Sequence, residues 1–410
     1  MISTEWIADD KKHYFRDIII VIIQQMILMK ADDYIFSIKP AVHYLDPFQE
    51  YILVFIITAI IWYFVSPRNL RGKVFNLNGQ IIMPFVILMI IELISCYNPT
   101  ANYSYHNGRW LYYPEYQLFM FFMAFLVIEL NISRKIWRTG MVIGYLIFIG
   151  TVFTDVFRPM TFSILTYRAA GLGLNPNISA EIIIMYLIMI LDWSSPSLYD
   201  GLFLLVGGVA EFATLSREGL LIYLFLLIVY IYFHRKQVNK LFYTFVPVLV
   251  VLIVGVLFAP SLLHHTTMFS INSNRLSAFL GKNTSYLASG NGRITFAILA
   301  FHLALDKPFF GYGLGYVSTL VDQPHNEYLA YFLEQGLVGL GVFIWWLWEL
   351  LKINFLRRNR VGLLMTLSIV IYGVFSHNIM EQKSLVEMVI LATLFPFMQP
   401  QGEKQAEVKA

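Results

Sequence analysis

The sequence predicts an all-α, polytopic membrane protein. Of its 410 residues, 58% are hydrophobic and only 13% are charged, whereas a soluble globular protein is nearer half apolar and a quarter charged. The apolar residues gather in runs long enough to cross the hydrocarbon core of a membrane. Inside lipid, only helices and closed barrels satisfy the backbone, and these runs lack the alternating pattern of a barrel. We therefore expect helices throughout.

About twelve apolar runs have a length close to that of a membrane span. Residues 1–400 are expected to form a single integral membrane domain, followed by a short polar tail at 400–410. The first run follows a basic segment and resembles a signal peptide. It has no small-x-small cleavage pattern, so we interpret it as an uncleaved span. The expected spans are 17–34, 49–66, 80–97, 114–131, 139–157, 178–193, 200–215, 218–234, 241–260, 327–351, 361–377 and 384–399.

The distribution of lysine and arginine predicts the orientation of these spans. Dense basic clusters occur at 11–16, 68–73, 134–138, 235–240 and 352–360. With this set of spans, all of these clusters fall on one side of the membrane, which the positive-inside rule identifies as the cytoplasm. Both termini are then cytoplasmic. The large loop at 259–326 lies on the periplasmic or extracellular face, and its length is more typical of a working surface than of a linker.

Composition also argues against several kinds of site. The single cysteine, Cys96, excludes an intramolecular disulfide and a cysteine-based metal site. The basic residues are scattered over short loops and form no continuous stripe, so no nucleic-acid partner is expected. The histidines do not gather at the spacings that a metal ion requires, and we expect neither a metal nor a cofactor.

Two groups of glycines are expected to be structural. Gly311, Gly313 and Gly315 form a G-x-G-x-G pattern, but no strand precedes it, so a tight turn is favoured over a dinucleotide site. Gly336 and Gly339 are expected inside a helix, where they would allow another helix to approach closely.

Arg217 is the first candidate for chemistry. It lies in the short turn 213–219 between two expected spans, and an arginine at the lipid boundary costs several kcal/mol unless it reaches water or a partner. One interpretation is a snorkelling side chain paired with Glu218 or Glu211. The other is an anion site at the outer membrane surface, because the planar guanidinium binds phosphate through two hydrogen bonds and keeps its charge.

Arg293 and His325 are the other two candidates. Arg293 follows Gly-Asn-Gly at the expected start of an apolar helix, where it could join backbone N–H groups around an anion. It could equally be a loop arginine in solvent. His325 begins an expected span at the outer surface, and histidine is suited to exchange a proton near neutral pH. The alternative is an interfacial histidine that caps the helix together with Asn326.

Taken in order, these motifs resemble one family. They are Arg-Ala-Ala-Gly…Asn-Pro-Asn at 168–177, Leu-Ser-Arg-Glu-Gly at 215–219, Gly-Arg at 292–293, Pro-Phe-Phe-Gly-Tyr-Gly at 308–313, and His-Asn at 325–326 with Glu-x-Gly-Leu-x-Gly at 334–339. Each motif alone is weak. The ordered set, with many spans and one large outer loop, resembles the O-antigen ligase and polymerase superfamily of bacterial envelope glycosyltransferases.

The resemblance implies a GT-C-like glycosyltransferase of the bacterial inner membrane. Its donor would be a glycan linked through diphosphate to undecaprenol, with no nucleotide sugar, metal or cofactor. By motif position, Arg217 and Arg293 would hold the diphosphate, and Arg168 is a weaker correspondence. His325 would match the essential periplasmic histidine and accept the proton of the acceptor hydroxyl, with Asn326 and Glu327 in support. A single displacement would invert the anomeric carbon.

The acceptor separates two members of this superfamily. A ligase transfers the glycan to lipid A–core, and a polymerase transfers it to a second lipid-linked glycan. The spacing of His325, Asn326, Gly336 and Gly339 is of the ligase type, and an Arg-x10-Gly pattern is absent after Arg168 and Arg293. The short connection before His325 also fits a polymerase. Ligase is favoured, polymerase is the alternative, and a lipid-linked oligosaccharide flippase is a third hypothesis that would expect inverted repeats and charges near the membrane midplane.

Overall fold

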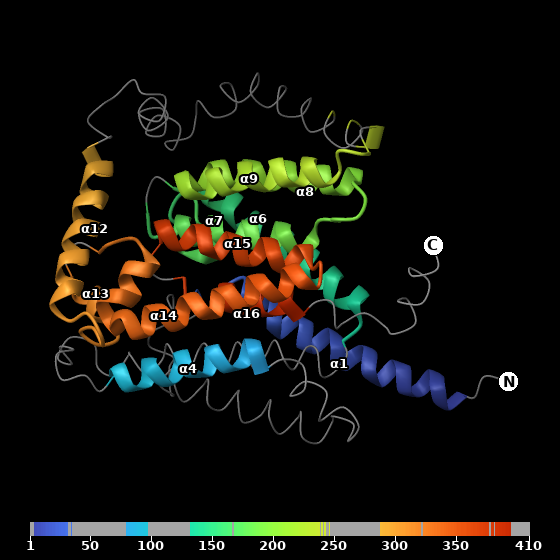
Figure 1. Ribbon diagram of the computed structural model, residues 1–410. Helices are drawn as coiled ribbons and strands as arrows, with labels where there is room; N and C mark the ends of the chain where they lie inside the picture. Colours follow the sequence, from blue (N-terminus) through green and yellow to red (C-terminus); the bar gives the residue numbers. More distant parts are fainter. Residues whose placement is uncertain are drawn as a thin grey trace, which may run out of the picture.

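The computed structural model confirms an all-helical fold over the residues that it describes (Figure 1). These residues are 4–31, 34, 79–96, 132–165, 168–237, 239, 240, 242, 246, 288–320, 323–376, 379, 380 and 382–394. No strand occurs among them. The expected spans at 49–66 and 114–131, nearly all of 241–260, the loop residues 259–287 and the tail at 400–410 lie outside the described residues.

The other nine expected spans correspond to helices. The first helix departs most from expectation, because it begins at Thr4 and ends at Leu28 and so overlaps the span expected at 17–34 only over residues 17–28. Most other boundaries agree within three residues, but α6 begins five residues earlier than expected, α14 ends five residues later and α16 ends five residues earlier. The helices are α1 (Thr4–Leu28), α4 (Gly79–Cys96), α6 (Arg134–Phe157), α7 (Pro176–Ile190), α8 (Leu198–Thr214), α9 (Arg217–Phe233), α14 (Glu327–Leu356), α15 (Arg360–Phe375) and α16 (Lys383–Leu394).

Two of the described helical segments are long and apolar enough to cross a membrane, Lys135–Phe157 in α6 and Glu327–Leu356, which is α14. Helices of this kind also occur as buried core helices of soluble proteins. Shorter apolar helical segments occur at Ile82–Ser95, Pro176–Ile190, Ile294–Asp306, Arg360–Phe375 and Ser384–Leu394. The number of spans and the side on which the large loop lies therefore stay predictions.

The central helix of the described bundle is α7. Fourteen of its 15 residues are buried, because it packs against α6, α8, α9, α15 and α16. A helix that is apolar on every face belongs in such an interior. At its C-terminal end, Nη2 of Arg138 donates 3.2 Å to the carbonyl of Ile190, and the Arg360 guanidinium donates to the carbonyl of Trp193. These cations complement the negative end of the helix dipole.

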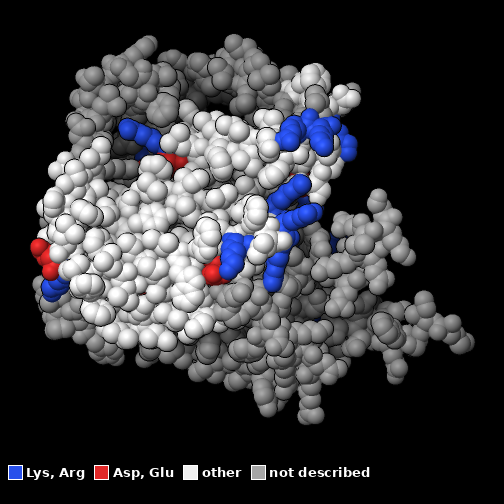
Figure 2. Space-filling model, in the orientation of Figure 1, with Lys and Arg blue, Asp and Glu red and all other residues white. Residues whose placement is uncertain are grey.

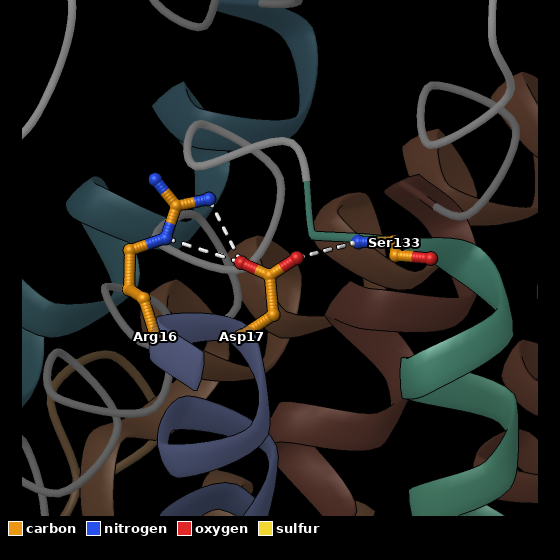
Figure 3. A network of polar contacts seen from close by, with 3 residues as sticks. All are labelled: Arg16, Asp17 and Ser133. Atoms are coloured by element: carbon orange, nitrogen blue, oxygen red, sulfur yellow. Dashed lines mark hydrogen bonds and ion pairs between the residues drawn. The ribbon is translucent and has the colours of Figure 1, made fainter. Parts of the chain in front are cut away.

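A carboxylate joins α1 to α6 (Figure 3). The buried Asp17 accepts hydrogen bonds from Nε and Nη2 of Arg16, at 3.1 and 2.8 Å. Its second oxygen accepts from the backbone N–H of Ser133 at 3.1 Å, and Ser133 is the N-cap of α6 without a side-chain cap of its own. Asp17 therefore supplies the negative charge that a helix N-terminus favours.

Helix α14 is interrupted at Gly336, where the expectation of a continuous helix is wrong. Gly336 has φ 68° and ψ −163°, because the loop after α12 (Ala288–Asp306) is inserted against it. The N–H of Leu337 donates to the carbonyl of Pro308 at 2.7 Å, and the N–H of Gly313 donates to the carbonyl of Glu334 at 2.8 Å. This loop leads into the short helix α13 (Tyr316–Thr319).

Glycine is required at Gly336 and Gly311 because two backbone segments are in contact there. A Cβ atom on Gly336 would lie 2.2 Å from the carbonyl carbon of Phe309, and one on Gly311 would lie 2.4 Å from that of Glu334. Gly311, Gly313 and Gly315 all have positive φ, which confirms the tight turn. Figure 1 shows α12 and α13 together at one end of the molecule, opposite the end at which α1 begins.

The visible surface is largely uncharged (Figure 2). Large apolar side chains are exposed along several helices, and on α9 they form a stripe of Leu221, Leu224 and Ile228, which are 59%, 53% and 66% exposed. An exposed apolar area of this kind marks contact with a membrane or a partner. Figure 2 shows the charged side chains in a few separate groups rather than spread evenly.

Candidate functional site

A pocket lies where the N-terminal ends of α7, α9 and α14 meet the C-terminal end of α15. It encloses about 450 Å³ of empty space, part of which is open to the outside. Helix N-termini carry partial positive charge and favour anions and polar groups. The lining residues are Asn175, Asn177, Ile178, Glu181, Ser216, Glu218, His325, Tyr372, Phe375 and Ser376.

Strained backbone surrounds this pocket. Leu174, Leu215 and His325 have φ values of 62°, 51° and 46°, a region that bulky residues rarely adopt. Leu174 precedes the α7 N-cap Asn175, Leu215 precedes the α9 N-cap Ser216, and His325 precedes the α14 N-cap. Each helix therefore enters the pocket through a left-handed turn. Strain of this kind persists where the surrounding structure enforces it and is concentrated at functional sites.

The 168–177 motif forms the first wall of the pocket, where Arg168 braces two helices through its hydrogen bonds. Nε of Arg168 donates to the carbonyl of Thr214 at 2.8 Å, and Nη2 donates to Oδ1 of Asn177 at 2.5 Å. The guanidinium thereby joins the end of α8 to the first turn of α7. Asp155 holds the same loop from behind, because its carboxylate accepts from the backbone N–H groups of Ala170 and Gly171 at 3.1 and 2.8 Å.

The 215–219 motif forms the second wall. Oγ of Ser216 accepts from the N–H of Gly219 at 3.2 Å and caps α9, and it donates to Oε2 of Glu218 at 3.2 Å. Gly219 allows α9 to approach α7, since a Cβ there would lie 2.5 Å from the Cβ of Ala180. The turn therefore directs Glu218 into the pocket and leaves the preceding side chain outside it.

Arg217 is that side chain. It is exposed, and its guanidinium has no hydrogen bond or ion pair with any residue that the structure describes. The expected alternative, a pair with Glu218 or Glu211, is not formed. Glu218 interacts with Ser216. Glu211 is fully buried, and neither of its carboxylate oxygens has a hydrogen-bond partner among the described residues.

The third wall contains His325, which lines the pocket between the loop and α14. The helix is capped by its neighbour, because Oδ1 of Asn326 accepts from the N–H of Leu329 at 2.9 Å. Glu327 is 3% exposed, and its carboxylate accepts from the N–H groups of Ile379 and Met380 at 3.0 and 3.2 Å. Asn326 thus caps α14 and Glu327 ties its first turn to the segment after α15, and neither side chain lines the pocket.

The structure brings Arg168, Arg217 and His325 to one region, and it describes only the backbone of Arg293. Helix α12 begins at Ala288, so Arg293 lies in its second turn and not at the helix N-terminus that the sequence predicted. Its side chain lies outside the described residues. Helix α12 packs on α14, and the Pro308–Gly315 loop fixes the two helices together through the Gly336 junction.

Sequence reasoning missed Glu181, Tyr372 and Ser376, which line the pocket from α7 and the end of α15. They lie within or beside apolar spans, where they are easily taken for packing residues. A carboxyl inside an otherwise apolar run was the available signal for Glu181. Within the described ranges, no group of three or more His, Cys, Asp or Glu side chains is placed to hold a metal ion.

Comparison with known proteins identifies the segment that carries most of these motifs. Residues 202–344 match the family model described as O-antigen ligase. This range includes Ser216, Arg217, Glu218, Arg293 and His325, whereas the part of the pocket contributed by α7 and α15 lies outside it. A search of curated proteins found no match. The family match over residues 202–344 supports the resemblance to the O-antigen ligase superfamily that the motifs indicated.

Proposed function

We propose that the chain is a glycosyltransferase of the bacterial inner membrane that moves a glycan from undecaprenyl diphosphate to an acceptor on the periplasmic face. One observation carries the proposal. Within the segment that matches the O-antigen ligase family, an exposed arginine without a partner among the described residues, Arg217, directly follows the pocket residue Ser216, and the same pocket is lined by His325. A cation next to a pocket that a histidine lines suits a reaction in which an anionic group leaves.

In the proposed reaction the oxygen of an acceptor hydroxyl bonds to the anomeric carbon of the donor. The bond between that carbon and the diphosphate oxygen breaks, and the leaving diphosphate takes the electron pair. His325 accepts the hydroxyl proton. Arg217 stabilises the negative charge that develops on the diphosphate. A single displacement of this kind inverts the anomeric carbon, and it uses neither a metal nor a cofactor.

The other predicted residues take different roles in the proposal. Arg293 is proposed as the second diphosphate contact, on the basis of its motif alone. Arg168 is engaged by Thr214 and Asn177, so we assign it to the shape of the pocket wall rather than to the diphosphate. Asn326 and Glu327 hold the backbone on either side of α14's first turn.

The proposed orientation is supported by the two ends of α7. Its N-terminal end faces the pocket, whereas its C-terminal end is held by Arg138 and Arg360. These arginines belong to the basic clusters at 134–138 and 352–360, which the positive-inside rule assigns to the cytoplasm. The pocket would then face the periplasm, with both termini in the cytoplasm.

Ligase is favoured over polymerase because of the spacing from His325 to Gly339, although the connection of nine residues between Gly315 and His325 is short enough for a polymerase. The test is deletion of the gene in its native host, followed by analysis of the surface glycan. Loss of long chains from lipid A–core with accumulation of long lipid-linked polymer identifies a ligase. A single repeat unit on the core identifies a polymerase. Unchanged glycan on the core contradicts both, and accumulation of donor on the cytoplasmic face alone indicates a flippase.

A further inference from the structure

Two polar atoms, each on a side chain that lines the pocket, lack hydrogen-bond partners among the described residues. They are Oε2 of Glu181, on α7, and the hydroxyl of Tyr372, on α15. Glu181 is 2% exposed and Tyr372 is 1% exposed. A buried polar group without a partner costs free energy comparable to a lost hydrogen bond, so most such groups in folded proteins are satisfied. Two of them on side chains that line one pocket indicate that a ligand supplies the missing bonds.

We propose that Glu181 and Tyr372 form a subsite for a sugar hydroxyl. One hydroxyl can donate its proton to the carboxylate and accept the phenol proton at the same time. An ionised phosphate cannot do this, because its oxygens are acceptors and have no proton to donate to Oε2 of Glu181. A lipid tail cannot either, because it forms no hydrogen bond. Phe375 adds an aromatic face to the pocket, and Asn175 and Ser376 add further polar groups.

The charges around the pocket indicate different places for the diphosphate and for the sugar of a lipid-linked glycan. No lysine or arginine is among the lining residues, and two carboxylates, Glu181 and Glu218, are. The diphosphate therefore stays at the exposed Arg217, and the sugar enters the cavity beside His325. This inference rests on the proposed function for the identity of the sugar, which belongs to either the donor or the acceptor. It assigns binding to residues of α7 and α15, outside the segment that matches the family model.

The first test uses the ligand-free protein and does not depend on the reaction. Tyr372→Phe removes only a hydroxyl without a partner, so the thermal midpoint of the detergent-solubilised protein is expected to stay the same or rise. The matched control is Tyr223→Phe on α9. The Tyr223 hydroxyl is 2.5 Å from the carbonyl of Leu204, and its removal leaves a buried carbonyl without that bond, so the midpoint is expected to fall. A fall for Tyr372→Phe as large as for Tyr223→Phe would mean that the Tyr372 hydroxyl already has a partner, and would overturn the proposal.

The second test uses two lipid probes in nanodiscs, undecaprenyl diphosphate and undecaprenyl-diphosphate-linked N-acetylglucosamine. If the donor sugar occupies the subsite, the sugar-bearing probe binds wild-type protein more tightly than the bare diphosphate. Tyr372→Phe and Glu181→Gln then each lose about two- to tenfold of that difference while binding undecaprenyl diphosphate as before. If the acceptor sugar occupies it, donor binding is unchanged and the KM for the acceptor rises by about the same factor. No change in either quantity overturns the proposal.

A double variant tests whether one hydroxyl bridges both groups. Because both bonds then depend on the same ligand group, Glu181→Gln with Tyr372→Phe is expected to cost less than the product of the two single losses. Fully independent losses would contradict a shared hydroxyl. Arg217→Ala separates this proposal from the wider one. If this variant binds undecaprenyl diphosphate as wild-type protein does, Arg217 is not the diphosphate site. The stability comparison of Tyr372→Phe with Tyr223→Phe uses ligand-free protein and does not depend on that result.

Discussion

Nη2 of Arg168 lies 2.5 Å from Oδ1 of Asn177, and this bond connects the loop before α7 to the wall of the pocket. The same guanidinium donates to the carbonyl of Thr214 through Nε. Two bonds from different nitrogens of one planar group require the geometry of arginine. Arg168 is therefore a structural part of the site, although its motif position suggested a contact with the diphosphate.

We predict that Arg168→Lys lowers the stability of the protein, because an ammonium cannot reach both acceptors in the directions that the guanidinium fits. Hydrogen bonds from a charged donor contribute about 1.5–3 kcal/mol each, so we expect a loss of about 2 kcal/mol, measured as a lower thermal midpoint in detergent. Arg158→Lys is the control, since that side chain is exposed. Equal midpoints for the two variants would show that the brace contributes nothing.

Arg217→Ala is expected to abolish glycan transfer while the protein inserts and folds normally. Removal of one stabilising group from an anionic transition state typically costs about 100- to 1,000-fold in rate. Because the side chain is exposed and has no partner among the described residues, stability should change by no more than about 0.5 kcal/mol. Complementation of a deletion strain measures transfer, and Arg235→Ala, at the other end of α9, is the control. Full complementation by Arg217→Ala would exclude it from the reaction.

A substitution that tests His325 should tolerate the positive φ of this residue. With φ at 46°, His325→Ala adds strain to the loss of the imidazole, whereas asparagine tolerates the left-handed region. We predict that His325→Asn abolishes transfer but keeps the thermal midpoint, and that His325→Ala also abolishes transfer with a lower midpoint. His302→Asn, an exposed histidine of α12, should transfer normally. Retained transfer in both His325 variants would remove the proposed base.

Arg293→Lys tests the residue whose side chain the structure does not describe. If Arg293 contacts the diphosphate through two hydrogen bonds, a lysine keeps the charge but loses the paired geometry. We expect transfer by membranes that contain this variant to fall about tenfold, with normal amounts of inserted protein. A wild-type rate would show that Arg293 does not make such a contact.

Much of the helical fold could be predicted because a chain inside a membrane can adopt few kinds of secondary structure. The helices α4, α8 and α9 begin and end within two residues of their expected bounds, because a chain inside lipid must satisfy its backbone hydrogen bonds internally and so forms a helix. The start of α1 was predicted less well, because its polar first half, Thr4–Arg16, is also helical in the structure. A polar helical segment has no run of apolar residues by which a membrane span could be predicted.

The site could be predicted only in part, because motifs name residues but not their partners. The motifs pointed to Arg217 and His325, and in the structure His325 lines the pocket and Arg217 follows its lining residue Ser216. They contained no sign that Arg168 donates to Asn177 and Thr214. Those bonds depend on where α7 and α8 meet. Glu181 and Tyr372 were missed for the same reason, since only the packing of α15 against α7 places both beside the pocket.

The break in α14 gives the sharpest test of the fold. Gly336 has a backbone conformation that is essentially restricted to glycine, with φ 68° and ψ −163°, and a Cβ there would lie 2.2 Å from the carbonyl carbon of Phe309. Strain of the backbone and overpacking each cost about 1–3 kcal/mol, so Gly336→Ala should destabilise the protein by about 3 kcal/mol or more.

Gly341, in the same helix, is the matched control for Gly336. An added Cβ at Gly341 meets nothing within 4 Å, and alanine is favoured over glycine in a helix interior by about 1 kcal/mol. Gly341→Ala should therefore keep or raise the thermal midpoint that Gly336→Ala lowers. Because the Gly336 junction also fixes the loop that follows α12, Gly336→Ala should expose residues 308–315 to protease as well. Equal midpoints and equal cleavage in the two variants would mean that α14 runs straight through Gly336 and that the loop is not inserted there.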